Sequence, residues 1–304
     1  MFEALCLGIL VLLGTAETLV MRPRAFAPLR LPSSLPNSPP SSAWTTTSLK
    51  SVSDGKAYGN DRGLSKVVTN MKPLPSDPFT LYVKPAADGV SVGDCPFAHA
   101  VRSALDFKGI KYELLPTSER AKPGWLIDYF DGALPALRHG SEVYTTSTVI
   151  MQYLDFFFTD DDEEEGEDSL GGGPLSEEAD EAVDGFFPSL AAYIKNVGDD
   201  AEDLEKFKVS LAKLEDHINV NISEYLTGET VAIVDLLITP QLHHMKVALD
   251  AFKDYKSEQL FAEHPNLKGY YDRKISEGVC FSNNKDYDDD VIVWGWGQAR
   301  DKQQ

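Results

Sequence analysis

Residues 79–158 contain short runs of apolar and polar residues that are typical of short strands and helices. Residues 79–84 are rich in β-forming side chains and predict a strand, and residues 98–108 have helix-forming character. Residues 111–116 predict a second strand, and residues 134–144 predict a hairpin that is followed by an apolar helix through Phe158. With a short helix before the hairpin, the order is strand, helix, strand, helix, strand, strand, helix. This order predicts an α/β domain.

The second part of the chain changes to a helical period. Apolar residues recur at intervals near 3.6 in residues 177–197 and 201–225, and residues 234–252 are apolar on nearly all sides. A further helix is expected near residues 265–277. We therefore expect an all-helical C-terminal domain over residues 176–304.

An acidic segment separates these two regions. Residues 160–168 contain eight acids in nine positions, and three glycines and a proline follow at residues 171–174. Charge repulsion and the conformational entropy of glycine favour an extended, solvated linker over residues 159–175. Cation binding is the alternative, but the carboxylates lack the spacing and the glycine placement of an EF-hand.

The N-terminal region has the composition of targeting segments. An uncharged run from Ala4 to Gly14 is too short to span a bilayer and predicts a signal peptide over residues 1–20, with a buried helix as the alternative. Residues 21–72 predict a disordered transit segment, since the stretch up to Ser53 has no acidic residue and many Ser, Thr and Pro. The junction around Phe26 resembles that of bipartite presequences. We therefore expect delivery to the plastid of an alga with a complex plastid.

The composition argues against a nucleic-acid-binding protein and excludes a disulfide-stapled scaffold. The 304 residues carry 48 acidic and 28 basic side chains, a formal net charge of -20, which repels nucleic-acid phosphates, so no nucleic-acid partner is expected. Three cysteines far apart in the sequence cannot form a disulfide framework, which excludes a disulfide-stapled scaffold.

Cys95 is the cysteine with a chemical signature. It precedes Pro96, which fits the first turn of a helix, so the sulfur is expected beside first-turn N–H groups that favour thiolate over thiol. A structural cysteine is the alternative. Because Ala98 stands where a second cysteine would complete a Cys-x-x-Cys pair, a partner thiol must come from outside, and glutathione is the obvious supplier.

A proline downstream agrees with this interpretation. In a thioredoxin-like domain, a cis proline before the third strand leaves the backbone of the preceding residue open beside the thiol, and Leu134-Pro135 has that position. The alternative is an ordinary proline at the start of a strand.

Several separated motifs resemble one family. They are Asp94-Cys95-Pro96-Phe97, Lys122-Pro123-x-Trp125, Leu134-Pro135, Ser147-Thr148-x-Ile150, Val234-Asp235-Leu236, Pro240-x-Leu242-x-His244 and Gly295-Trp296. In this order they resemble the plant-type dehydroascorbate reductases, which lie in the glutathione transferase superfamily and are related to the chloride intracellular channel proteins. The resemblance covers roughly residues 79–298.

The resemblance implies a fold and a reaction. The expected fold is an α/β thioredoxin-like, glutathione-binding domain over residues 73–158 followed by the all-α domain, as in glutathione transferases. The implied reaction is the glutathione-dependent reduction of dehydroascorbate to ascorbate. Glutathione is then a co-substrate, no metal is involved, and we expect a monomer without stable membrane insertion.

The resemblance also implies roles for individual residues. Cys95 is the implied nucleophile. The implied glutathione-binding residues are Lys84, Asp94, Lys122, Leu134, Pro135, Ser147 and Thr148, and the implied substrate-binding residues are Lys84, Asp94, His244 and Trp296. Each has a plainer alternative: solvated charges for the lysines, a satisfied helix histidine for His244, and packing of the tail for Trp296.

Two positions depart from the family pattern. Thr148 stands where the family usually has Asp, so a carboxylate contact to the γ-glutamyl amine of glutathione is lost or weakened, and we expect lower affinity for glutathione. Ala232 replaces a Thr that normally caps the helix containing Asp235, which removes about 0.5–2 kcal/mol of local stability.

Two other functions share parts of this signature. An omega-like thiol transferase, which removes glutathione from mixed disulfides, uses the same single cysteine. A channel-protein-like module that inserts into membranes needs a long hydrophobic helix, whereas residues 96–108 are too short and contain three charged side chains.

Overall fold

The computed structural model describes residues 29–30, 77–158, 169–174, 176–221, 223–278 and 288–302. The predicted signal peptide lies outside these residues, and so does the predicted transit segment except for Leu29 and Arg30. The acidic run of the predicted linker and Cys280 also lie outside them.

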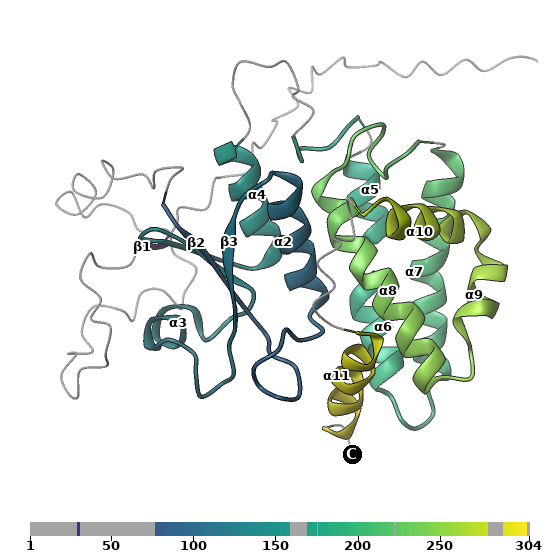
Figure 1. The fold of residues 1–304 in the computed structure, drawn as a ribbon. Helices are drawn as coiled ribbons and strands as arrows, with labels where there is room; N and C mark the ends of the chain where they lie inside the picture. Colours follow the sequence, from purple (N-terminus) through teal and green to yellow (C-terminus); the bar gives the residue numbers. More distant parts are fainter. Residues whose placement is uncertain are drawn as a thin grey trace, which may run out of the picture.

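One mixed sheet forms the N-terminal part (Figure 1). Its strands are β1 (Leu29–Arg30), β2 (Phe79–Val83), β3 (Tyr112–Pro116), β4 (Ala136–His139) and β5 (Glu142–Thr145), in the order β1-β5-β4-β2-β3. β2 and β3 are parallel and are joined by a helical crossover, and the other pairs are antiparallel. The C-terminal end of β2 and the N-terminus of the crossover helix therefore lie at the same end of the sheet.

Helices cover both faces of this sheet. α2 (Pro96–Phe107) and α4 (Ser147–Phe158) lie between the sheet and the C-terminal helices, whereas α3 (Gly124–Phe130) lies on the other side (Figure 1). Successive side chains of β2 point to opposite faces of the sheet, so each face has its own core. Leu81 belongs to the large core, and Tyr82 packs with Leu126 of α3 in a small core on the other face.

Every described element from residue 176 onward is a helix. They are α5 (Ser176–Val183), α6 (Phe186–Lys195), α7 (Ala201–Val220), α8 (Ile233–Phe252), α9 (Ser257–Glu263), α10 (Pro265–Glu277) and α11 (Asp289–Asp301). The predicted fold class, an α/β thioredoxin-like part followed by an all-helical part, is confirmed. No helix in the described ranges is both long and apolar enough to cross a membrane.

The structure differs locally from the predicted elements, and α9 and α11 have no predicted counterpart. The continuous helix expected over residues 177–197 is two helices, because Gly185 has a φ of 77° and ends the helical backbone between α5 and α6. The Gly-rich end of the predicted linker packs against the protein: Leu170 is buried, its N–H donates to Asp155, and Gly171 bridges to Ala232 before α8.

Candidate active site

Cys95 is the N-cap residue of α2, the position that the sequence predicts. It is partly exposed, and it is the one cysteine among the described residues. Pro96 occupies the first turn, where its missing N–H costs no hydrogen bond. The Cys95 side chain therefore lies at the N-terminus of the crossover helix.

A tight loop between β2 and α2 brings two charges together beside Cys95. The Gly93 N–H donates to the Lys84 carbonyl at 2.8 Å, and a side chain at Gly93 would come within 2.6 Å of the Pro85 carbonyl oxygen. This close approach requires glycine. It closes the loop so that Lys84 Nζ lies 2.6 Å from Asp94 Oδ1.

Burial raises the pKa of the Cys95 thiol, which is the opposite of the direction predicted from the sequence. The N–H groups of Ala98 and Phe97 lower that pKa, as expected at a helix N-terminus, although the thiol makes no capping hydrogen bond. The Asp94 charge raises it and the Lys84 charge lowers it. Desolvation outweighs the first-turn amides, and the two charges oppose each other.

Two helices of the C-terminal part complete the surroundings of Asp94. α11 contributes Trp294, whose ring lies 5.9 Å from the Lys84 ammonium, and Gly295, which lies directly against the Asp94 carboxylate. α8 contributes His244, whose ring is hydrogen-bonded to the Asp94 backbone. The loop before Cys95 is thus enclosed by residues distant in the sequence.

His244 and Trp296 meet at this interface. Their rings pack edge to face with centroids 6.4 Å apart, and both side chains are buried. Burial lowers the pKa of His244 well below its ordinary value, so the imidazole is neutral at physiological pH. His244 Nε2 and Trp296 Nε1 are buried without a hydrogen-bond partner.

The other predicted residues lie on separate elements of the α/β part. The Leu134–Pro135 peptide bond is cis and immediately precedes β4, as predicted. Lys122 precedes α3 and its ammonium pairs with Glu119 at 2.6 Å. Ser147 is buried at the start of α4, and Thr148, the next residue, is exposed.

Sequence reasoning missed several residues of this site. Phe97 packs edge to face on Phe187 of α6 at 5.0 Å, and Phe187 lies 6.0 Å from Trp296. Trp294 and Gly295 also border the site. Phe97 and Gly295 stand in two of the motifs that carry the family resemblance, but these motifs carry no information on what the two residues contact.

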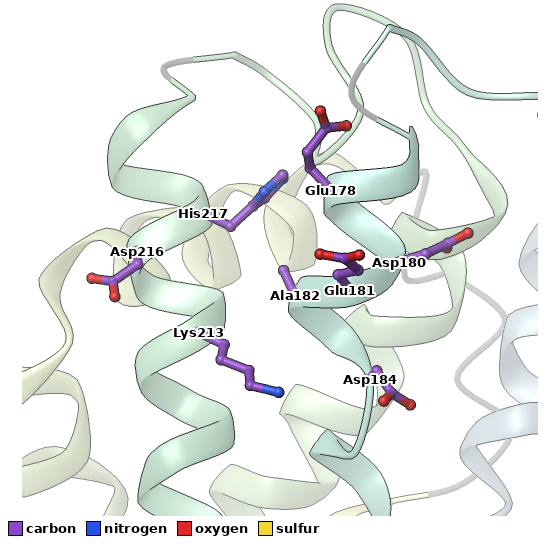
Figure 2. Close-up of a pocket in the computed structure, with 8 residues that line it drawn as sticks. All are labelled: Glu178, Asp180, Glu181, Ala182, Asp184, Lys213, Asp216 and His217. Atoms are coloured by element: carbon purple, nitrogen blue, oxygen red, sulfur yellow. The ribbon is translucent and has the colours of Figure 1, made fainter. Parts of the chain in front are cut away.

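A separate groove of about 790 Å³ lies between α5 and α7 (Figure 2). Its walls carry mostly carboxylates, with Lys213 and His217 on the α7 side. His217 is engaged structurally, since its Nε2 lies 2.8 Å from the Leu226 carbonyl oxygen. No nucleophile and no predicted site residue lines this groove, so the candidate active site is the region around Cys95.

Comparisons with known proteins agree with this location. Residues 90–158 match the model of the glutathione S-transferase N-terminal domain. The Arabidopsis thaliana protein "Glutathione S-transferase DHAR3, chloroplastic" is 26% identical over 67% of this chain and 74% of its own length. "Glutathione S-transferase DHAR2" of the same plant is 28% identical over 67% of this chain and 90% of its own length. This chain resembles the plant-type dehydroascorbate reductases.

A solved structure of such a reductase has a fold similar to that of this chain. The crystal structure of Chlamydomonas reinhardtii dehydroascorbate reductase superposes with a TM-score of 0.59 at 24% identity. It covers 73% of this chain and 98% of the algal chain. The architecture is therefore that of the glutathione transferase superfamily, with Cys95 at the start of the first helix of the matched domain.

Proposed function

We propose that this protein reduces dehydroascorbate to ascorbate with glutathione as the electron donor. The observation that carries the proposal is a partly exposed cysteine at a helix N-terminus, Cys95, with the Lys84–Asp94 pair beside it. The two relatives named DHAR and the matched glutathione transferase domain support the substrate class.

Glutathione binds along the α/β part in this proposal. The backbone of Leu134, which precedes Pro135 and β4, pairs with the peptide-like backbone of glutathione in the manner of a strand. Lys122 supplies a positive charge to a carboxylate of the tripeptide. Ser147 and Thr148, at the N-terminus of α4, receive the γ-glutamyl carboxylate, because free N–H groups and the helix dipole favour an anion there.

Dehydroascorbate binds on the opposite side of Cys95, between the two parts of the protein. Lys84 and Asp94 contact its oxygens, and these charged groups also approach glutathione. His244 and Trp296 line this side, where Trp296 Nε1–H can donate a hydrogen bond and the Nε2 of neutral His244 can accept one. Their burial makes such hydrogen bonds stronger than they would be in water.

The reaction proceeds in three balanced steps, each centred on the Cys95 sulfur. In the sulfenic acid route, the thiolate passes two electrons to dehydroascorbate with uptake of one water, which releases ascorbate and leaves a sulfenic acid on Cys95; a glutathione thiolate then attacks this sulfur, and the sulfenic oxygen takes up a proton and leaves as water. In the thiohemiketal route, the thiolate adds to a carbonyl carbon of dehydroascorbate; a glutathione thiolate then attacks the Cys95 sulfur, the C–S bond breaks and its electron pair leaves with ascorbate. Both routes give the same mixed disulfide between Cys95 and glutathione. A second glutathione attacks this disulfide, which frees glutathione disulfide and restores the Cys95 thiolate.

The charge pair explains how a thiol with a raised pKa enters this cycle. Asp94 disfavours the thiolate and Lys84 favours it. When Asp94 accepts a hydrogen bond from substrate, its charge is partly satisfied elsewhere, and the Lys84 ammonium acts on the sulfur. Thiolate formation is then coupled to occupation of the site.

The decisive experiment measures ascorbate formation from dehydroascorbate and glutathione by the wild-type protein and by Cys95→Ser. We expect loss of at least about 100-fold in kcat for the variant, because a serine hydroxyl cannot cycle between reduced and oxidised states. The matched control is Cys280→Ser, which should retain activity. Full turnover by Cys95→Ser would refute the mechanism.

A second substrate separates this reaction from thiol transfer. The same proteins are assayed with a glutathionylated model peptide, and kcat/KM is compared with that for dehydroascorbate. Preference for the peptide would identify an omega-like thiol transferase and contradict the proposed substrate, while leaving the role of Cys95 intact.

We propose that the protein works in a plastid, in agreement with the relative named as chloroplastic. Fusion of residues 1–72 to a fluorescent reporter tests this in an alga with a complex plastid. Plastid fluorescence supports the assignment, and retention of the reporter in the cytosol contradicts it.

A further inference from the structure

Gly295 of α11 lies so close to Asp94 that a side chain there would collide with the Asp94 carboxyl group. A Cβ atom at Gly295 would lie 1.9 Å from Asp94 Oδ2, 2.4 Å from Cγ and 2.7 Å from Oδ1. These distances are far inside van der Waals contact. The three nearest atoms all belong to the carboxyl group of Asp94, so the obstruction comes from that one side chain.

The same helix provides a matched position without this contact. Gly297 lies two residues further along α11, and a Cβ atom there would meet no atom within 4 Å. Neither glycine has the positive φ that would make an alanine strained. The substitutions Gly295→Ala and Gly297→Ala therefore differ in whether the added methyl group collides with Asp94.

α11 is held in place against the site. His243 Nε2 of α8 lies 2.9 Å from Asp289 Oδ1 in the first turn of α11. Ile292 is fully buried, and Trp296 is buried against Phe187 and His244. Because the helix is anchored on both sides of Gly295, an added methyl group displaces the Asp94 side chain in preference to the helix.

We propose that Gly295 is a positioning residue: by lacking a side chain, it lets α11 close on Asp94 and hold the Lys84–Asp94 pair beside Cys95. The 2.6 Å ion pair, the Trp294 ring near Lys84 and the bare Cα of Gly295 form one continuous contact. The C-terminal helix thereby sets the geometry of charges next to a nucleophile on the other part of the protein. Its effect on turnover rests on the proposed function, whereas its effect on the thiol does not.

The consequence for Cys95 has a definite sign. Within the pair, Asp94 disfavours the Cys95 thiolate and Lys84 favours it. Moving the carboxylate away from Lys84 leaves the ammonium unneutralised near the sulfur. Displacement of Asp94 should therefore make the thiol more reactive toward a small alkylating reagent, while it removes a group needed for substrate.

The experiment compares Gly295→Ala with Gly297→Ala in the full chain, each with Asp94 present and in an Asp94→Ala background. The first readout is the rate of Cys95 alkylation by iodoacetamide between pH 6 and pH 10, with Cys280 replaced by Ser throughout. The second is kcat/KM for dehydroascorbate. Circular dichroism establishes that each variant is folded.

We expect Gly295→Ala to lower the midpoint of the alkylation profile by about half a pH unit, which is about a threefold increase in rate below the midpoint. We expect kcat/KM to fall about tenfold, because the misplaced groups no longer meet the substrate. Gly297→Ala should change neither quantity. In the Asp94→Ala background, Gly295→Ala should have no further effect on alkylation.

Three results would overturn the inference. They are an unchanged alkylation profile in Gly295→Ala, an equal effect in the presence and absence of Asp94, and a Gly295→Ala protein that fails to fold even when Asp94 is replaced by Ala. If wild-type protein fails to reduce dehydroascorbate but the alkylation pattern holds, the proposed function fails and the positioning role stands.

Discussion

The reactivity of Cys95 is decided by groups that act in opposite directions on one sulfur. Desolvation and Asp94 favour the thiol, while the first-turn amides and Lys84 favour the thiolate. The sequence shows that Cys95 stands at a helix N-terminus, because Cys-Pro precedes a predicted helix. The sequence does not show the desolvation of the thiol, because desolvation arises from atoms of distant segments that pack around the loop.

Thr148 offers a test of the glutathione site at the scale of one residue. It is exposed at the second position of α4, where a carboxylate could reach the γ-glutamyl amine of a bound glutathione. Thr148→Asp should bind glutathione more tightly, with a decrease in Kd of about threefold to tenfold for one charge-assisted hydrogen bond. Isothermal titration of both proteins measures this, with Thr148→Asn as the uncharged control. Equal affinities would argue against glutathione at this helix terminus.

His244 makes stability depend on pH. Its pKa in the folded protein is well below the ordinary 6.5 because it is buried, so below that pH the unfolded chain takes up a proton that the folded protein does not. The contribution of buried, neutral His244 to the free energy of unfolding is fully present above pH 6.5 and is lost as the pH falls below that value. From pH 6 to 5, wild-type protein should lose about 1 kcal/mol more unfolding free energy than His244→Asn, measured by urea denaturation. Parallel losses in the two proteins would contradict this.

The start of α8 shows how an element compensates for a missing cap. Ala232 has no side-chain acceptor, yet Asp235 reaches back and accepts the Ala232 N–H at 3.0 Å. The same carboxylate accepts the Leu226 N–H at 2.9 Å and the Tyr270 hydroxyl at 2.7 Å. One buried acid thus ties the helix start to the preceding loop and to α10.

Replacement of this acid should weaken the whole C-terminal part. In Asp235→Asn an amide N–H₂ must face at least one buried donor, and each donor left unpaired costs about 1–3 kcal/mol. Tyr270→Phe removes a single donor and leaves the two backbone contacts, so it should cost about 1 kcal/mol. Chemical denaturation of both variants gives the comparison. A smaller loss for Asp235→Asn than for Tyr270→Phe would show that the carboxylate is not the organising group.

At the scale of the whole molecule, the two parts share one hydrophobic core. A single cluster of buried residues includes Leu81 of β2, Ala104 of α2, Leu242 of α8 and Trp296 of α11. α2 packs directly on α8, and the sheet lies on the other side of α2 and α4 (Figure 1). The reactive loop therefore belongs to an interface that neither part forms alone.

A shared core predicts cooperative unfolding. We expect one calorimetric transition, with equal calorimetric and van't Hoff enthalpies, because neither part can open without exposing the core of the other. Exposure of Cys95 to a thiol reagent should follow the same denaturant midpoint as the loss of helix signal. Two resolved transitions, or exposure of Cys95 well before the helices unfold, would contradict this.

Local periodicity predicted most of the elements and the division into an α/β part and a helical part, although it predicted neither α9 nor α11. Strand and helix periods depend on neighbours in sequence, and so does the placement of Cys95 before Pro96, or of Pro135 before a strand. The break at Gly185 was visible as a glycine but not as a left-handed turn, since backbone conformation there depends on how α5 and α6 pack. Tertiary structure alone decided which groups surround the sulfur. The contact between Gly295 and Asp94, the burial of His244 and the net effect on the thiol all arise where remote segments meet, and no pattern along the chain encodes a distance between them.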